Sequence, residues 1–192
     1  MSFIRMEEVG GGSLDRVNKI LAGVQGGAMK AVSSALKRAG DTAKTQAGRF
    51  AAAQYTISKG EFMRNVATKS HIKAEAGGAV SMSISFSGRV LPLLTFNTRF
   101  SRDGHVQTQV KRNGGASTLE QAFVANIYGH VGVFERVGAP RFPVEQKYGP
   151  STGHMMQNDE VIAMMDQAVR ETYEKRIDHE IMRVLNGWGG RG

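Results

Sequence analysis

The spacing of the apolar residues changes twice along this chain. Residues 14–24 and 29–50 place an apolar side chain at every third or fourth position, with Gly26-Gly27 between the two stretches. Residues 80–86 instead alternate apolar side chains with serines, and residues 162–185 return to the helical spacing. A period near 3.6 buries one face of a helix and a period of 2 buries one face of a strand. The chain is therefore predicted to contain helices at both ends and strands between them.

The ends of the helical stretches carry capping signals. Ser58 and Glu61 have capping-box spacing, in which serine accepts from a backbone amide and glutamate reaches back. Asn158 is the expected N-cap of the last helix, and Asn186-Gly187 is the expected stop. Gly77-Gly78 is expected to end the first helical half. These signals give the helical segments defined limits.

The middle of the chain is predicted to form strands. Turn residues such as Arg102-Asp103-Gly104 separate short segments rich in valine, isoleucine and phenylalanine. The predicted strands span 80–86, 90–96, 106–110, 122–128 and 131–137. The fold class is therefore α+β, with a central antiparallel β-sheet of about four or five strands flanked by a long N-terminal helix and a C-terminal helix.

The glycines and prolines suggest how this domain is bounded. Residues 1–12 end in three glycines and are predicted to form a flexible N-terminal arm. A single α+β domain is expected over residues 13–186, and a mobile tail over 187–192. Residues 138–157 hold three of the four prolines and are predicted to form an extended loop within the domain.

The motifs of common catalytic sites are absent from the sequence. There is no cysteine, which excludes disulfides and thiolate ligands, and no P-loop, dinucleotide-binding glycine pattern or G-x-S-x-G elbow. His179-Glu180 begins like a zinc-protease helix, but Arg183 stands where the second histidine would be. No cofactor or metal is predicted, and no enzyme activity. No apolar run is long enough to cross a membrane.

Scattered histidines and carboxylates leave a hydrolase as an open alternative. The five histidines are far apart in sequence, so only the fold could gather them. Asp103 suits a turn, and Glu135 is expected to pair with Arg136 or Arg141. Met155-Met156 could be a soft contact surface or ordinary core, because thioethers repack easily.

The net charge of +8 is unevenly distributed. Residues 1–150 carry 20 Lys/Arg against 10 Asp/Glu, whereas residues 151–192 carry 5 against 7. Such a chain could bind nucleic acid, or its acidic end could contact the basic body of another copy. The best nucleic-acid candidate is the basic face of the first long helix, formed by Lys30, Lys37, Arg38, Lys44 and Arg49.

Several short motifs follow one another in a defined order along the chain. The alanine-rich first helix leads to Tyr55-Thr56-Ile57-Ser58, and the strand region holds ISFSGRVLPLLTF over 84–96. The densest part, residues 133–156, contains Arg136-x-Gly138, Arg141-x-Pro143-Val144 and Gly149-Pro150-Ser151. Over residues 13–186, this order resembles the phage minor tail protein Z family, the tail completion proteins of lambda-like siphophages.

The resemblance implies a structural role in the virion. Such proteins complete the head-proximal end of the tail and work with the tail terminator and the head-completion or neck proteins. Like other head–tail joining proteins, this chain would form a homo-oligomeric ring around a DNA passage, without sequence-specific DNA binding. It would be found in the virion tail, and in the host cytoplasm during assembly. A basic nucleic-acid-binding domain is the alternative function.

No catalytic residues come with the resemblance, so its densest motifs are interpreted as a contact surface. Prolines fix the path of the loop, and arginines can bind carbonyls or a neighbour's carboxylates. The predicted interface residues are Arg136, Pro140, Arg141, Phe142, Pro143, Gly149, Pro150, Ser151 and Met155.

Overall fold

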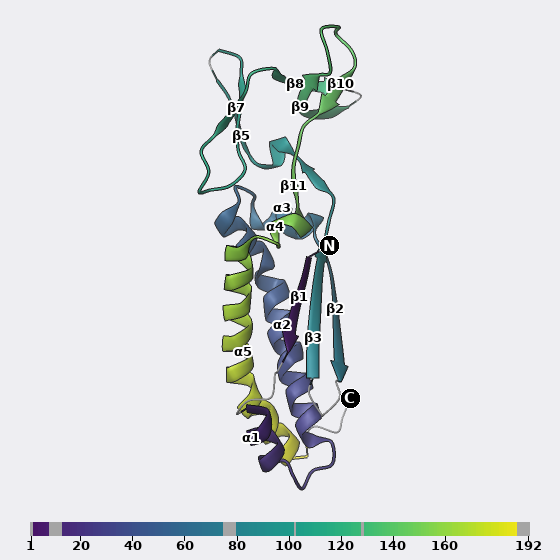
Figure 1. Cartoon of the computed structure of the whole chain (residues 1–192), viewed down its shortest axis with the longest axis vertical. Coiled ribbons are helices and arrows are strands. Elements are labelled where there is room, and N and C mark those ends of the chain that lie inside the picture. Colours follow the sequence, from purple (N-terminus) through teal and green to yellow (C-terminus); the bar gives the residue numbers. More distant parts are fainter. Residues whose placement is uncertain (1, 8–12, 75–79, 102, 128, 188–192) are drawn as a thin grey trace. The chain divides into compact units, whose positions relative to one another are not determined.

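The computed structural model describes residues 2–7, 13–74, 80–101, 103–127 and 129–187 (Figure 1). The chain divides into two compact units. We call them the helical unit, comprising Ser2–Ala47, Thr68–Phe86 and Ile162–Gly192, and the strand-rich unit, comprising Gly48–Ala67 and Ser87–Val161. The prediction of one domain over residues 13–186 stays a prediction, since two compact units can belong to a single domain.

The helical unit pairs two long helices with one small sheet. Helices α2 and α5 lie side by side, and the sheet covers another side of α2 (Figure 1). The sheet has the order β1-β3-β2, with β1 and β3 antiparallel. The elements are α1 (Ser13–Ile20), α2 (Gly27–Gln54), α5 (Asp159–Leu185), β1 (Ser2–Glu7), β2 (Ala67–Ala74) and β3 (Val80–Ser87).

Small residues on α2 allow the sheet and the second helix to approach closely. The buried face of α2 in this unit is mostly alanine, and strand β3 supplies the bulky side chains Met82, Ile84 and Phe86. A Cβ added at Gly40 would lie 2.6 Å from the Met82 sulfur. A Cβ at Gly27 would lie 3.2 Å from a methyl group of Val184 on α5. The alanines and glycines of α2 therefore have a packing role.

The strand-rich unit contains three small antiparallel sheets. Their strand orders are β5-β6-β7, β10-β9-β8 and β11-β4. Leu93, Val106, Ala122 and Val133 form a core between them. The elements are α3 (Lys59–Asn65), β4 (Val90–Pro92), the 3-10 helix η2 (Leu93–Thr95), β5 (Asn97–Phe100), β6 (Val106–Gln109), β7 (Ser117–Leu119), β8 (Ala122–Ile127), β9 (His130–Arg136), β10 (Val144–Gln146), β11 (Tyr148–Ser151) and α4 (Thr152–Met155).

The α+β class is confirmed, with several corrections. The strands are divided among small sheets of two or three strands instead of one sheet of four or five. Residues 2–7 form β1, whose pairing with β3 supplies the backbone hydrogen bonds that an arm would leave to water. The predicted loop over 138–157 contains β10, β11 and α4. Residues 8–12 and 188–192 lie outside the described residues.

The helix caps are largely as predicted. Ser58 Oγ accepts from the Glu61 amide at 3.1 Å, although the Glu61 carboxylate accepts from Arg64 and Asn65 instead of reaching back. Asn158 Oδ1 accepts from the amides of Glu160 and Val161. Helix α3 ends at Asn65, well before Gly77-Gly78, because the chain turns into strand β2 at Ala67.

Asn158 also connects the start of α5 to a buried tyrosine. The Asn158 side chain hydrogen-bonds Tyr55, which is 3% exposed and follows the last residue of α2. Burial raises the pKa of Tyr55 above its ordinary value of 10.0, and the Asn158 hydrogen bond lowers it by less. The folded state therefore favours the neutral phenol.

This tyrosine predicts an alkaline loss of stability. An acid whose pKa is raised on folding contributes stability below its unfolded pKa and loses it as the pH rises through the folded value. The wild-type chain should therefore lose free energy of unfolding above pH 10.0 relative to Tyr55→Phe, which has no proton to release there. Urea unfolding of both proteins on either side of that pH measures the difference. If both proteins lost the same free energy of unfolding, burial would not raise the pKa of Tyr55.

Candidate interaction surface

The sheet β10-β9-β8 carries apolar side chains on both of its faces. Ala122, Val124 and Val133 point to the core of the strand-rich unit. Residues two apart on a strand share a face, and residues paired across strands do so too. The registers Phe123↔Phe134 and Ala125↔Gly132, with Val144↔Arg136 on the other side of β9, therefore define the opposite face. A small antiparallel sheet usually presents polar residues on the face turned away from the core.

A pocket of about 470 Å³ lies on this second face. Its lining includes three aliphatic residues, Ala125, Ile127 and Val144, which we call its floor, and two aromatic residues, Phe123 and Phe142. Asn126, Arg136 and Arg141 complete the lining. We call these eight residues the sheet pocket. Phe142 is 61% exposed, so an aromatic ring borders the pocket and is largely open to solvent.

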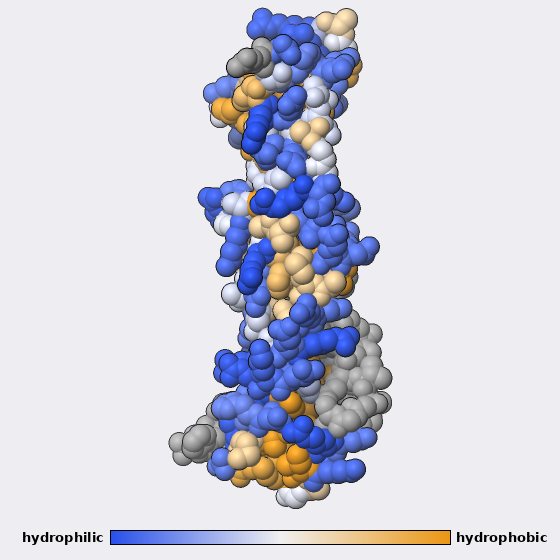
Figure 2. All heavy atoms as spheres, turned by 90° about the vertical axis from the view of Figure 1, so that its left-hand side faces the viewer, coloured by the Kyte–Doolittle hydropathy of each residue, from blue (hydrophilic) through white to orange (hydrophobic). Residues whose placement is uncertain are grey.

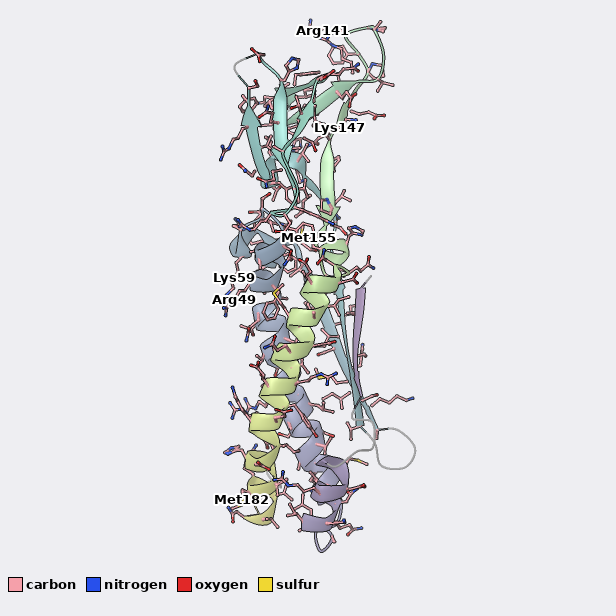
Figure 3. The ribbon with its side chains drawn as sticks, turned by 60° about the vertical axis from the view of Figure 1, so that its left-hand side comes forward. Arg49, Lys59, Arg141, Lys147, Met155 and Met182 are labelled. Carbon is pink, nitrogen blue, oxygen red and sulfur yellow. The ribbon has the colours of Figure 1, made fainter. Side chains whose placement is uncertain are left out.

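Two arginines of the sheet pocket stack on its aromatic rings. The Arg136 guanidinium carbon lies 5.5 Å from the centroid of Phe123, and that of Arg141 lies 5.8 Å from Phe142. Figure 3 shows Arg141 in the loop that joins β9 to β10. A guanidinium stacked on a ring keeps its in-plane N–H donors free. The pocket therefore combines an apolar floor with positive charge.

The acidic residues near this sheet form no ion pair with Arg136 or Arg141 in the described part of the chain. Glu135 forms an ion pair with Lys147, and not with Arg136 or Arg141 as expected. Alternation along β9 explains the difference, because Glu135 and Arg136 point to opposite faces. Glu120 lines a neighbouring pocket of about 500 Å³ that shares Phe123 and Arg136. Within the described residues, neither Arg136 nor Arg141 forms an ion pair with a carboxylate.

The structure separates the predicted interface residues into two groups. Arg136 is at the end of β9, and the exposed residues Pro140, Arg141, Phe142 and Pro143 belong to the loop after it. The second group, Gly149, Pro150, Ser151 and Met155, lies in β11 and α4. Only Arg136, Arg141 and Phe142 line the sheet pocket.

Residues of the second group have structural contacts. A Cβ at Gly149 would overlap the Phe96 ring, and Ser151 Oγ accepts from the His154 amide to cap α4. Met155 and Met156 are 0% exposed, so of their two predicted readings the core is the one observed. Figure 3 shows Met155 at α4. The structure thus places Met155 in the core of its unit.

The apolar residues of the sheet pocket were not predicted to belong to a site. Phe123, Ala125 and Ile127 were interpreted only as strand residues. A signal was present, because AFV at the start of β8 is a continuous apolar run and such runs occur in strands buried on both faces. An apolar run on an edge strand of a small sheet would have indicated a second contact surface.

A second apolar region lies in the helical unit. Figure 2 shows it over α1 and the C-terminal end of α5. Ile20 is 43% exposed, Met182 56% and Leu185 47%. Val24 is also exposed. We call these four residues the helical-end patch, and Figure 3 labels Met182 within it.

The basic face of α2 remains exposed to solvent, apart from one residue. Lys30, Lys37 and Arg38 are exposed in the helical unit, and Arg49 is exposed in the strand-rich unit, where Figure 3 labels it. Lys44 differs, since it pairs with Asp41 at 2.7 Å and donates to Ser70 at 3.3 Å. Its charge is therefore partly neutralised.

Neither a metal site nor a membrane-spanning helix is found in the described residues. In the ranges that the structure describes, no group of three His, Asp or Glu side chains is placed to hold a metal ion. None of the described helices is both long and apolar enough to span a bilayer.

The comparisons with known proteins add no relative. No family model matches the chain, and neither a curated protein nor a solved structure matches it.

Proposed function

We propose that this chain is a structural protein of a phage tail that completes the head-proximal end and helps to form the neck, as a ring around the DNA passage. It acts by binding neighbours and carries out no reaction. Its partners are other copies of itself, the tail terminator and the head-completion proteins. The order of motifs over residues 13–186 supports this proposal, since it resembles the minor tail protein Z family.

The observation that carries the proposal is the apolar second face of the sheet β10-β9-β8. Phe123, Ile127 and Val144 line a pocket there, and Phe142 is largely exposed beside them. Apolar side chains gathered at a surface are typical of contacts with another molecule. The helical-end patch gives the chain a separate apolar surface, and a protein that joins its own copies to other components needs more than one.

Electron microscopy of purified virions tests the proposed function. An affinity tag placed after Gly192 and labelled with gold should give density at the head–tail junction. Virions without the tag, treated with the same label, control for non-specific binding. Averaged images should show this chain as a ring at the neck. Label at the distal tip of the tail, or only in infected cells and never on particles, would refute the proposal.

A further inference from the structure

We propose that the sheet pocket binds an acidic, amphipathic segment of another protein. The inference deepens the proposed function, because it rests on the view that this chain acts by contacting neighbours and names the chemistry of one of them. Its basis is the juxtaposition, in one pocket, of three aliphatic residues with two arginines that lie over aromatic rings.

The floor of the pocket selects apolar side chains. Ala125, Ile127 and Val144 present only hydrocarbon groups, and each is partly exposed. Covering them would remove apolar surface from water, which stabilises a complex by about 25 cal/mol per Å². The ring of Phe123 adds a flat wall beside this floor. A leucine or phenylalanine of the partner fits this environment.

The rim of the pocket selects negative charge. Arg136 and Arg141 are its only charged lining residues among those described, and no carboxylate lines it. Both guanidinium groups lie over aromatic rings, which attract the positive charge. Their free N–H edges can each form paired hydrogen bonds with a carboxylate. Carboxylates next to apolar side chains therefore match the rim and floor together.

A second copy of this chain is a poorer occupant than an acidic partner. Exposed acidic residues of α5, such as Glu171 and Glu174, stand on a helix whose apolar stripe is buried in its own unit. That helix could satisfy the arginines but could not fill the aliphatic floor.

Nucleic acid also fits the pocket less well than an acidic segment. Binding to single strands uses several cations along a groove and aromatic faces on which bases stack. Here two cations line the pocket, and each lies over one of its rings. An aliphatic floor gives no hydrogen bonds to bases. Duplex and single-stranded DNA therefore serve as competing probes in the test.

Fluorescence anisotropy with defined peptides tests the inference. The probe is a short fluorescein-labelled peptide in which Glu and Leu alternate. Two matched peptides replace all Glu by Lys or all Leu by Ser. The full chain should bind the Glu-Leu peptide at least about tenfold more tightly than either matched peptide, because only that one satisfies both rim and floor.

Three variants locate the binding. Arg136→Glu and Arg141→Glu should each weaken binding of the Glu-Leu peptide by at least about tenfold. Lys111→Glu is the matched control, since it makes the same charge change at an exposed residue of the strand-rich unit outside the pocket. It should change binding by less than about twofold, as expected for a distant charge in salt. Circular dichroism of each variant verifies its fold.

Several outcomes would overturn the inference. They are no binding of the Glu-Leu peptide, equal binding of the Glu-Ser peptide, or equal losses in Lys111→Glu and Arg136→Glu. Tight DNA binding that the two arginine variants abolish would assign the pocket to nucleic acid. Self-association of the free chain that Arg141→Glu abolishes, measured by sedimentation, would assign it to a second copy.

The peptide test and the virion test fail independently. If the chain is found at the neck but does not bind the Glu-Leu peptide, the proposed function stands and the inference about the pocket is refuted. If the chain binds the Glu-Leu peptide but is absent from the neck, the proposed function is refuted and the inference about the pocket stands.

Discussion

Replacing Gly88 with alanine is expected to lower the free energy of unfolding by about 3 kcal/mol. A Cβ at this position would lie 2.6 Å from the Asn65 carbonyl oxygen and would also overlap Thr152 Oγ1. That hydroxyl shares its hydrogen between two backbone carbonyl oxygens, Asn65 O at 3.2 Å and Ser87 O at 3.4 Å. Thr152 is 0% exposed. The neighbours are backbone or buried, so relief requires movement of α3 or α4. Urea unfolding followed by circular dichroism measures the loss.

Gly60→Ala is the matched control for this substitution. Gly60 lies in α3, and a Cβ there would meet nothing within 4 Å. Alanine is favoured over glycine in a helix by about 1 kcal/mol, so this variant should be slightly more stable than the wild-type chain. The same chemical change is thus expected to have opposite signs at the two positions. A Gly88→Ala variant as stable as the wild type would show that Asn65 and Thr152 do not approach Gly88 this closely.

The long periodic segments could be predicted from the sequence because each carries its own signal. The break at Gly26-Gly27, the alternation over residues 80–86 and the cap at Asn158 depend only on neighbouring residues. All three correspond to observed features, namely the gap between α1 and α2, strand β3 and the start of α5. Local patterns suffice where one face of an element is buried continuously.

Strands without that pattern could not be predicted. All eight residues of β2 are exposed, so the sequence ATKSHIKA has no buried face to impose an alternation. The strand exists because β3 offers it a partner, which is a non-local cause. Similarly, one continuous strand was predicted over 90–96, but the chain passes into η2 at Leu93. Pairing partners and sheet division are properties of the whole chain.

Only part of the candidate surface was predicted, because the rest of it depends on contacts between distant segments. Arg136 and Arg141 stood out as charged residues in a dense motif, and both line the sheet pocket. Their stacking on Phe123 and Phe142 depends on the register of β8 with β9 and on the path of the following loop. Neither is visible in a single segment. The apolar floor was missed because it becomes a surface only once the opposite sheet face is known to be the core.

Replacing Arg183 with alanine is expected to lower the free energy of unfolding by about 3 kcal/mol. Arg183 donates to Glu180 at 2.9 Å, and the Glu180 side chain is only 4% exposed. Removing the arginine leaves a carboxylate buried without this ion pair, which costs more than the pair contributed.

Glu180→Leu should cost less than about 1 kcal/mol, because Arg183 is 36% exposed and can be hydrated alone. Urea unfolding of the two single variants and the double variant separates the effects. Since the penalty arises from the buried charge, Arg183→Ala should cost little once Glu180 is leucine, and a full additive loss in the double variant would refute this explanation.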